Sequence, residues 1–230
     1  MTDFEHITSF QNSKIKLAQK LRDKRHRGRE ELFVIEYSRD LARALDRDYR
    51  VKFALFCPEY ADSDDNALLN QIDVPVYQVT AALLDKASYR QNPGGLLAIM
   101  HTKPVKAADT LTQITSQHIL GLEGLRKPGN IGALLRTADA AGFDTILLID
   151  CPLDIYNPNI IRSSTGAVFL DNIYSLSSQD ALSFLKDSGY AIISADPTGT
   201  HDLYGLNFSE KSALILGAEA TGLSDLWQAN

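Results

Sequence analysis

Cysteine is one of the rarest residues in this sequence: the 230-residue chain contains only Cys57 and Cys151. Two thiols cannot form a disulfide framework or a four-thiolate metal site, so we expect each to be a small buried apolar residue. Apolar runs long enough to span a bilayer are also missing, as is the apolar region of a signal peptide. These absences predict a cytoplasmic protein without membrane association.

Several common functional motifs are absent as well. No glycine precedes Lys-Ser or Lys-Thr in the P-loop frame, and G-x-G-x-x-G does not occur between a strand and a helix. Ser163, Ser164 and Thr165 do not form a nucleophile elbow. None of the five histidines lies three or four residues from another ligand on one helix face, so we expect no metal site. They are His6, His26, His101, His118 and His201.

The charge distribution is uneven. The chain carries a net charge of −6, but the stretch "KIKLAQKLRDKRHRGR" (14–29) contains eight of the 23 Lys and Arg residues and a single acid, Asp23. A basic segment on an acidic body is typical of a polyanion contact. The alternative is a solvated helix face without a partner.

Hydrophobic periodicity predicts an α/β protein with two parts. In the first hundred residues it predicts a helix at 9–24 with Gly28 ending the run, strands at 31–36, 51–57, 74–79 and 95–100, and helices at 38–46 and 80–87. After a polar segment at 101–113 it predicts strands at 118–122, 145–150, 167–174, 190–195 and 213–217, with helices at 130–141, 158–165 and 179–188. We expect an N-terminal α/β domain (1–104), a linker (105–116) and a C-terminal domain (117–230). The near-continuously apolar strands of the second part favour a parallel sheet covered on both faces.

Open parallel sheets bind ligands beyond the carboxyl ends of their strands, which directs attention to the loops at 123–130, 151–158, 196–205 and 218–224. By local physics alone, Asn130 is an N-cap of the following helix. Arg136 falls opposite the apolar face of that helix, so its simplest explanation is solvation.

Three segments in order resemble the signatures of the SpoU-type RNA 2′-O-ribose methyltransferases. "NIGALLRTA" (130–138) resembles the first signature, NxGxxxR, and "LGAEATGLS" (216–224) resembles the second. "RSSTGA" (162–167) resembles the small-residue segment between them. The basic stretch and "NPGGLLAIM" (92–100) resemble the ribosomal-protein-like RNA-binding domain that precedes the catalytic domain in many members.

The resemblance implies a SPOUT α/β knot, a rare exception among folds, with S-adenosylmethionine as the methyl donor. It also implies a homodimer and an RNA substrate, ribosomal RNA rather than transfer RNA. The resemblance implies three catalytic residues: Arg136, Asn130 and Glu219. It also implies that the donor is bound by Gly217, Ala195, Leu216 and Gly222. Arg136 is expected to orient the ribose 2′-hydroxyl and stabilise charge, since a free arginine stays protonated above pH 12. The alternative, removal of the hydroxyl proton by Arg136, would need a special local electric field. Lys20, Lys24, Arg25 and Arg27 are the expected RNA contacts.

The sequence departs from the family pattern at three places. Lys127 stands where many members have an acid before proline, and Ala218 stands where asparagine is common. The third signature, which completes the knot and the donor pocket, is expected beyond Trp227, whereas the sequence stops at Asn230. We therefore expect a C-terminally truncated methyltransferase domain with an incomplete knot. The alternative is a protein that binds structured RNA without transferring a methyl group.

Overall fold

The computed structural model describes residues 4–143, 145–199, 201–202, 205 and 211–229. The contacts within the chain divide it into two compact units. Unit 1 comprises Met1–Lys103 with Asp154–Phe169, and unit 2 comprises Pro104–Leu153 with Leu170–Asn230. Residues 154–169, which the sequence places inside the C-terminal domain, thus make their contacts with the N-terminal part. None of the described helices has the length and apolar character needed to cross a membrane.

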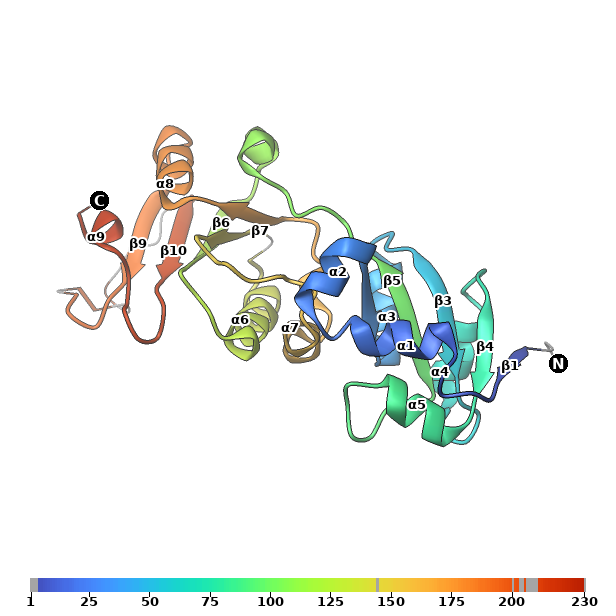
Figure 1. The fold of residues 1–230 in the computed structure, drawn as a ribbon. Helices are drawn as coiled ribbons and strands as arrows, with labels where there is room; N and C mark the ends of the chain where they lie inside the picture. Colours follow the sequence, from blue (N-terminus) through green and yellow to red (C-terminus); the bar gives the residue numbers. More distant parts are fainter. Residues whose placement is uncertain (1–3, 144, 200, 203–204, 206–210, 230) are drawn as a thin grey trace. The chain divides into compact units, whose positions relative to one another are not determined.

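Unit 1 is built around a mixed five-stranded sheet in the order β1-β4-β3-β5-β2 (Figure 1). Strands β1, β4 and β3 are parallel, and β5 is antiparallel to both of its neighbours, β3 and β2. Its elements are β1 (Glu5–Ile7), α1 (Ser13–Lys20), α2 (Lys24–Glu30), β2 (Leu32–Ile35), α3 (Ser38–Leu45), β3 (Val51–Phe56), α4 (Ser63–Leu69), β4 (Val76–Val79), α5 (Ala81–Ala87), β5 (Leu96–His101), α7 (Pro158–Ser164) and the 3₁₀ turn η2 (Ala167–Phe169).

One face of this sheet forms a core with α1 and α5. Alternate residues of β3 and β5, among them Leu55 and Ile99, point to the same side and belong to one cluster with Ile15, Leu83 and Leu84 of the two helices. Cys57 belongs to the same cluster, as the sequence predicts. Helices α1 and α5 therefore pack on this face of the sheet because each buries its apolar stripe against it.

Within unit 1, residues 154–169 pack on the N-terminal part of the unit through an aromatic cluster. The ring of Phe33 on β2 stacks on Tyr156 with centroids 4.5 Å apart and also contacts Phe169 at 5.9 Å. The Tyr156 hydroxyl donates to the Lys103 carbonyl at 2.8 Å and accepts from the Lys103 amide at 2.9 Å. Because the Tyr156 hydroxyl both donates and accepts a hydrogen bond, burying it does not leave a polar group without a partner. The rings add large apolar contacts to the cluster.

Arg27 is an internal residue of unit 1. Its side chain is 2% exposed and forms an ion pair with Asp154, with 2.6 Å between Nε and Oδ2. Its Nη1 also donates to the carbonyls of Leu21 and Arg22, both at 2.8 Å. The expectation that Arg27 contacts RNA is therefore corrected, because its guanidinium is already used inside the protein.

The basic stretch forms two helices rather than one. Asp23 has an extended backbone, with φ −92° and ψ 133°, and its carboxylate accepts from the Arg25 amide, so it starts α2 as an N-cap. Gly28 lies within α2, and the helix ends at Glu31 in the left-handed region (φ 53°). The prediction that Gly28 ends the run was wrong.

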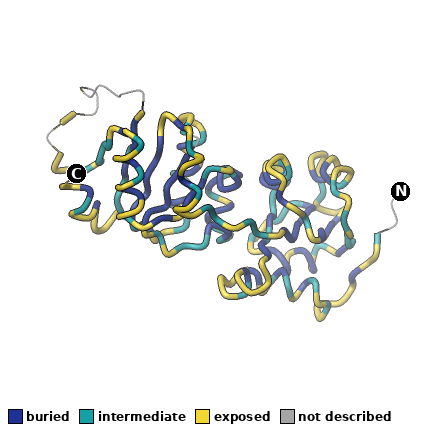
Figure 2. Tube along the Cα trace, turned by 90° about the horizontal axis from the view of Figure 1, so that it is seen from above, coloured by how far each residue is buried: buried dark blue, intermediate teal, exposed yellow. Residues whose placement is uncertain are grey.

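Unit 2 has a five-stranded parallel sheet in the order β8-β7-β6-β10-β9. This confirms the predicted α/β class with a parallel sheet. Strands β6, β7, β8 and β10 are mostly buried, whereas β9 at the sheet edge has no buried residue (Figure 2). The elements are η1 (Ala108–Gln113), β6 (His118–Glu123), α6 (Pro128–Ala140), β7 (Thr145–Ile149), β8 (Ile173–Leu176), α8 (Ser178–Asp187), β9 (Ala191–Ala195), β10 (Ser212–Leu216) and α9 (Asp225–Gln228).

The strand predicted at 167–174 exists only at its end. Thr165 and Gly166 have positive φ values of 50° and 89°, so the chain turns there. Phe169 is buried in the aromatic cluster of unit 1, and the strand begins at Ile173 in unit 2. The apolar run at 167–174 thus contributes its first residues to the core of unit 1 and its last residues to the sheet of unit 2. Among the described residues, the short elements β1, α4, η1, η2 and α9 were not predicted.

The Arg27–Asp154 pair predicts a large effect on stability. Asp154→Ala leaves a buried guanidinium without its carboxylate, which should lower the free energy of unfolding by about 3 kcal/mol. The exposed pair of Arg29 and Glu30 provides the control, because water screens this pair and Glu30→Ala should change the free energy of unfolding far less than Asp154→Ala does. Urea unfolding followed by near-UV ellipticity reports on the tyrosine cluster of unit 1. Equal midpoints for the two variants would contradict this assignment.

Candidate functional site

The loop between β6 and α6 brings the first signature to the edge of the parallel sheet. Gly124 follows β6 with φ +64°, and Pro128 occupies the first turn of α6, whose N-cap is Lys127. A proline is well placed there because its missing amide has no helical partner. Asn130 is therefore the third helical residue, and the local explanation of Asn130 as an N-cap is wrong.

The second signature forms a closed turn after β10. The Ala218 amide donates to the Gly222 carbonyl at 3.1 Å, and the Gly222 amide donates back to Ala218 at 2.8 Å. A Cβ atom at Gly217 would lie 2.3 Å from the Gly222 carbonyl carbon, and Gly222 has φ +67°. Both glycines are thus required by the turn, which presents Glu219 at its tip.

Asn130 and Glu219, 89 residues apart in the sequence, are in contact. The Asn130 side-chain amide donates to Oε1 of Glu219. The backbone amide of Glu219 and the Asn130 side chain lower the pKa of the Glu219 carboxyl, and the charge of Lys127 adds to this effect. Glu219 is consequently an ionised acceptor at neutral pH, and the two signatures meet at one place.

Arg136 lies six residues after Asn130 on α6, about 9 Å farther along the helix axis. It is exposed, and no hydrogen bond or ion pair joins it to any residue that the structure describes. Because six residues turn a helix by about 240°, Arg136 and Asn130 leave the helix in different directions. The structure thus does not bring Arg136 to the Asn130–Glu219 pair, and it leaves a guanidinium available to another molecule.

The four residues expected to bind the donor lie at the carboxyl ends of neighbouring strands. Leu216, the last residue of β10, pairs with Ala195 on β9 and with Leu122 on β6. Gly217 follows Leu216 directly and Gly222 closes the turn. Ala195 and Gly222 are exposed, while Leu216 and Gly217 are half-buried. This edge therefore offers small or apolar side chains and reachable backbone groups, which suits an uncharged ring system.

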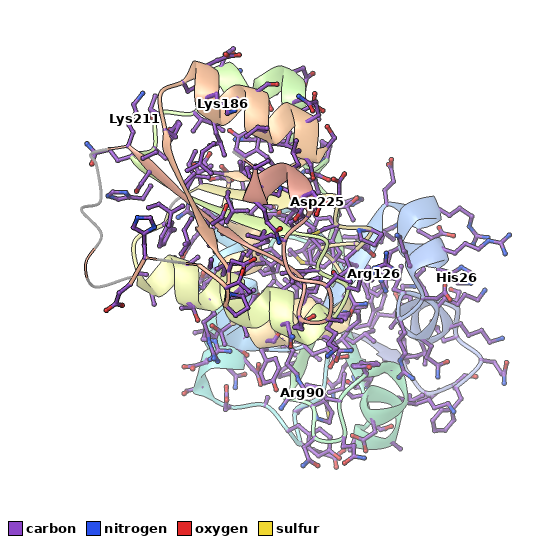
Figure 3. The ribbon with its side chains drawn as sticks, turned by 90° about the vertical axis from the view of Figure 1, so that its left-hand side faces the viewer. His26, Arg90, Arg126, Lys186, Lys211 and Asp225 are labelled. Atoms are coloured by element: carbon purple, nitrogen blue, oxygen red, sulfur yellow. The ribbon has the colours of Figure 1, made fainter. Side chains whose placement is uncertain are left out.

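Glu123 is the site residue that the sequence analysis missed. It ends β6, is 6% exposed, and accepts from the Ser224 amide at 2.8 Å, the Ser224 hydroxyl at 2.6 Å and the Trp227 indole at 2.9 Å. The Ser178 hydroxyl at the start of α8 lies 2.9 Å away. Glu123 thus fixes the segment after the second signature, including α9, which begins at Asp225 (Figure 3). The only signal in the sequence is an acid ending an apolar strand.

The remaining polar groups have simpler surroundings. Arg126, on the loop after β6 (Figure 3), is exposed. Burial raises the pKa of the Cys151 thiol, and its Sγ donates to the Leu122 carbonyl at 3.3 Å. Within the described ranges, no group of three or more His, Cys, Asp or Glu side chains is arranged to hold a metal ion. Lys20, Lys24 and Arg25 are exposed on unit 1.

Comparison with known families and proteins agrees with this geometry. The model of the SpoU rRNA Methylase family matches residues 117–230, and that of the MRM3-like substrate binding domain matches residues 12–98. A 23S rRNA (guanosine(2553)-2′-O)-methyltransferase, RlmP, of Bacillus subtilis is 26% identical over 95% of this chain and 84% of its own length. A 23S rRNA (guanosine-2′-O-)-methyltransferase, RlmB, of Vibrio vulnificus is 28% identical over 69% of this chain and 66% of its own length.

Solved structures share the fold over nearly the whole chain. The crystal structure of an RNA 2′-O ribose methyltransferase is 29% identical with a TM-score of 0.84, covering 97% of this chain and 86% of that chain. An AdoMet-bound rRNA methyltransferase from Sinorhizobium meliloti has a TM-score of 0.81 at 24% identity, over 96% and 84% of the two chains, and this likeness concerns the fold. With both family models matched in order along the chain, the protein belongs to the SpoU rRNA methylase family and carries an MRM3-like substrate-binding domain ahead of its methylase domain.

Proposed function

We propose that this chain transfers a methyl group from S-adenosylmethionine to a ribose 2′-hydroxyl of ribosomal RNA. The family and the names of its relatives support this activity. The observation that carries it is the contact between Asn130 and Glu219, because it joins the two signatures at the sheet edge where Leu216 and Ala195 end their strands.

The residues at this edge fit the methyl donor. Ala195, Leu216, Gly217 and Gly222 would hold its adenosine part through small side chains and backbone groups. Once bound, the donor supplies an electrophilic methyl group on a sulfonium, so the protein needs to align the hydroxyl and ease loss of its proton. An AdoMet-bound structure is known for the S. meliloti rRNA methyltransferase, which shares the fold.

Arg136 is the proposed group that acts on the substrate. Its guanidinium stays protonated, so it orients the 2′-hydroxyl and stabilises the charge that develops on the oxygen or the neighbouring phosphate. Asn130 and Glu219 hold the second-signature turn against α6 and position the substrate. An exposed Arg136 is also consistent with a site shared with a second copy of the chain, and we include a homodimer and a cytoplasmic location in the proposal.

Unit 1 is the proposed RNA-binding part. Lys20, Lys24 and Arg25 would contact phosphates, which gives affinity and little sequence readout. The domain boundaries at 104 and 117 are also part of the proposal, with residues 154–169 making their contacts in unit 1.

Replacement of Arg136 tests the activity. Arg136→Ala should lower kcat by about 100-fold or more, because it removes a charge-stabilising donor, while the affinity for S-adenosylmethionine should stay unchanged. The measurement is transfer of a labelled methyl group to ribosomal RNA, with Lys186→Ala as a control for loss of a positive charge on α8. Equal kcat values for Arg136→Ala and the unmodified chain would refute this role. RNA binding without any transfer by the unmodified chain would favour the non-catalytic alternative.

Charge reversal in the basic stretch tests the RNA contact. The combined variant Lys20→Glu, Lys24→Glu and Arg25→Glu should weaken RNA binding, and each lost phosphate contact should reduce the slope of log K against log salt by about 1. Lys186→Glu reverses one charge on unit 2 and should leave the slope unchanged. An unaltered slope in the combined variant would assign these residues to a solvated face.

A further inference from the structure

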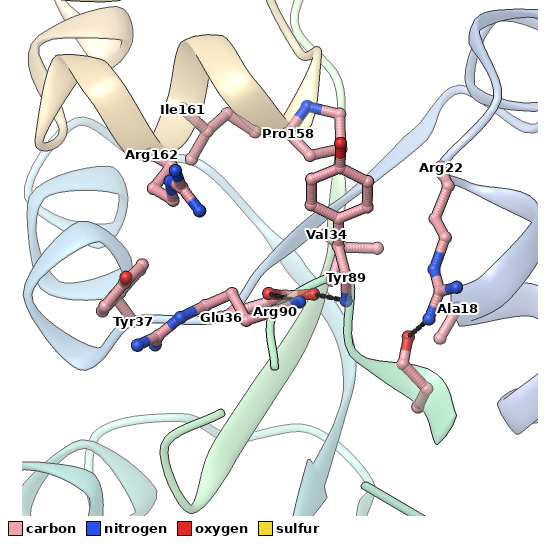
Figure 4. A pocket seen from close by; sticks show the side chains of 11 residues that line it. Ala18, Arg22, Val34, Glu36, Tyr37, Tyr89, Arg90, Pro158, Ile161 and Arg162 are labelled. Atoms are coloured by element: carbon pink, nitrogen blue, oxygen red, sulfur yellow. Dashed lines mark hydrogen bonds between the residues drawn. The ribbon is translucent and has the colours of Figure 1, made fainter. Parts of the chain in front are cut away.

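A pocket lies within unit 1, between α1, the end of β2, the loop after α5, and α7 (Figure 4). Its interior holds only about 30 Å³, room for one or two water molecules, so a larger ligand would lie across its mouth. Its apolar lining comes from Ala18, Val34, Ala87, Pro158 and Ile161. Its polar lining comes from Arg22, Glu36, Tyr37, Tyr89, Arg90 and Arg162. None of these residues belongs to the Asn130–Glu219 site.

The loop that carries Tyr89 and Arg90 is held in place by two charged groups. The Glu36 carboxylate accepts the backbone amides of both residues, at 3.2 Å for Arg90. From the other side, Arg22 donates to the carbonyls of Lys86, at 2.9 Å, and Ser88. Burial raises the pKa of Glu36, against the effect of these two amide bonds. The loop is thus fixed in the free protein, and a ligand would meet it already formed.

The fixed loop presents an aromatic ring and cationic groups to the pocket. Tyr89 is 46% exposed, although it is a large aromatic residue. The Arg90 guanidinium lies 3.5 Å from the centre of the Tyr37 ring. Arg162 on α7 is exposed and has no hydrogen bond or ion pair with the part of the chain that the structure describes. Three arginines against a single acid make the pocket suited to an anionic ligand with a flat ring.

We propose that the mouth of this pocket, where Tyr89 and Arg162 are exposed, binds one unpaired nucleotide of the RNA substrate. The base stacks on the Tyr89 ring above the apolar lining, and Arg162 neutralises a phosphate next to it. Stacking on an aromatic side chain beside a cationic group is how proteins bind single-stranded RNA. A paired A-form helix keeps its bases inside the stack, so the bases of a duplex cannot stack on Tyr89 in this way. The proposal rests on the proposed function, because that function supplies the RNA.

Tyrosine substitutions separate this role from general RNA affinity. Tyr89→Ala should weaken binding of an RNA hairpin with an adenosine loop by about tenfold, and Tyr89→Phe should retain binding because it keeps the ring. Binding of the same stem as a blunt duplex should be unchanged in both variants. Tyr60→Ala is the matched control, since Tyr60 is 40% exposed in the same unit and lies outside the pocket. The measurement is fluorescence anisotropy of labelled RNA, with S-adenosylmethionine binding measured in parallel.

Three outcomes would overturn the pocket proposal. The first is equal hairpin affinity for Tyr89→Ala and Tyr60→Ala. The second is equal loss of hairpin and duplex binding. The third is saturable binding of free adenosine monophosphate as tight as that of the hairpin, which would assign the pocket to a free nucleotide. Methyl transfer tests the proposed function separately: an unmodified chain that binds the hairpin through Tyr89 but transfers no methyl group would overturn the activity and support the pocket.

Discussion

The buried carboxylate of Glu123 is the constraint on which the proposed methylation site depends. It ends the central strand β6 and binds Ser224 and Trp227, which follow the second signature, while the Ser178 hydroxyl lies against it from α8. A buried charge is costly unless it is fully hydrogen-bonded, so these partners and Glu123 require one another. The anchored segment continues directly from the turn at 217–222, whose tip places Glu219 on Asn130. One charge thus connects the sheet, the second signature and α6.

In unit 1 a buried positive charge likewise connects segments that are distant in the sequence. Arg27 is buried against Asp154, 127 residues later, and the aromatic cluster of Phe33, Tyr156 and Phe169 adds apolar contact around that connection. Because residues 154–169 pack here, α7 contributes Arg162 and Ile161 to the pocket in this unit. The segment that resembles a family signature at 162–167 therefore takes part in the structure of the substrate-binding unit.

Local pattern predicted most of the secondary structure, since apolar strands such as β7 and β10 and amphipathic helices such as α8 follow from their own residues. The functions of charged residues could not be predicted in this way. Arg27 and Lys24 are indistinguishable within the basic stretch, and only the distant Asp154 makes one of them internal. Similarly, asparagine is a residue type that often caps helices, but here the helix already starts at Pro128. The Asn130 side-chain amide instead donates a hydrogen bond to Glu219. The family resemblance predicted that Asn130 and Glu219 belong to one site. The role of Glu123 could be identified only from its hydrogen bonds in the structure.

The most direct test of this account is the response of the single tryptophan, Trp227, in Glu123→Gln. Glutamine keeps the size of the side chain but removes the charge and one acceptor oxygen, so we expect altered Trp227 emission and faster hydrogen exchange of the Ala218, Gly222 and Ser224 amides. Affinity for S-adenosylmethionine should fall by about tenfold, since hydrogen bonds to a charged group are worth about 1.5–3 kcal/mol. Asp180→Asn, a neutralised carboxylate at the start of α8, should leave all three quantities unchanged. Unaltered exchange and donor affinity in Glu123→Gln would contradict the claim that this carboxylate assembles the site.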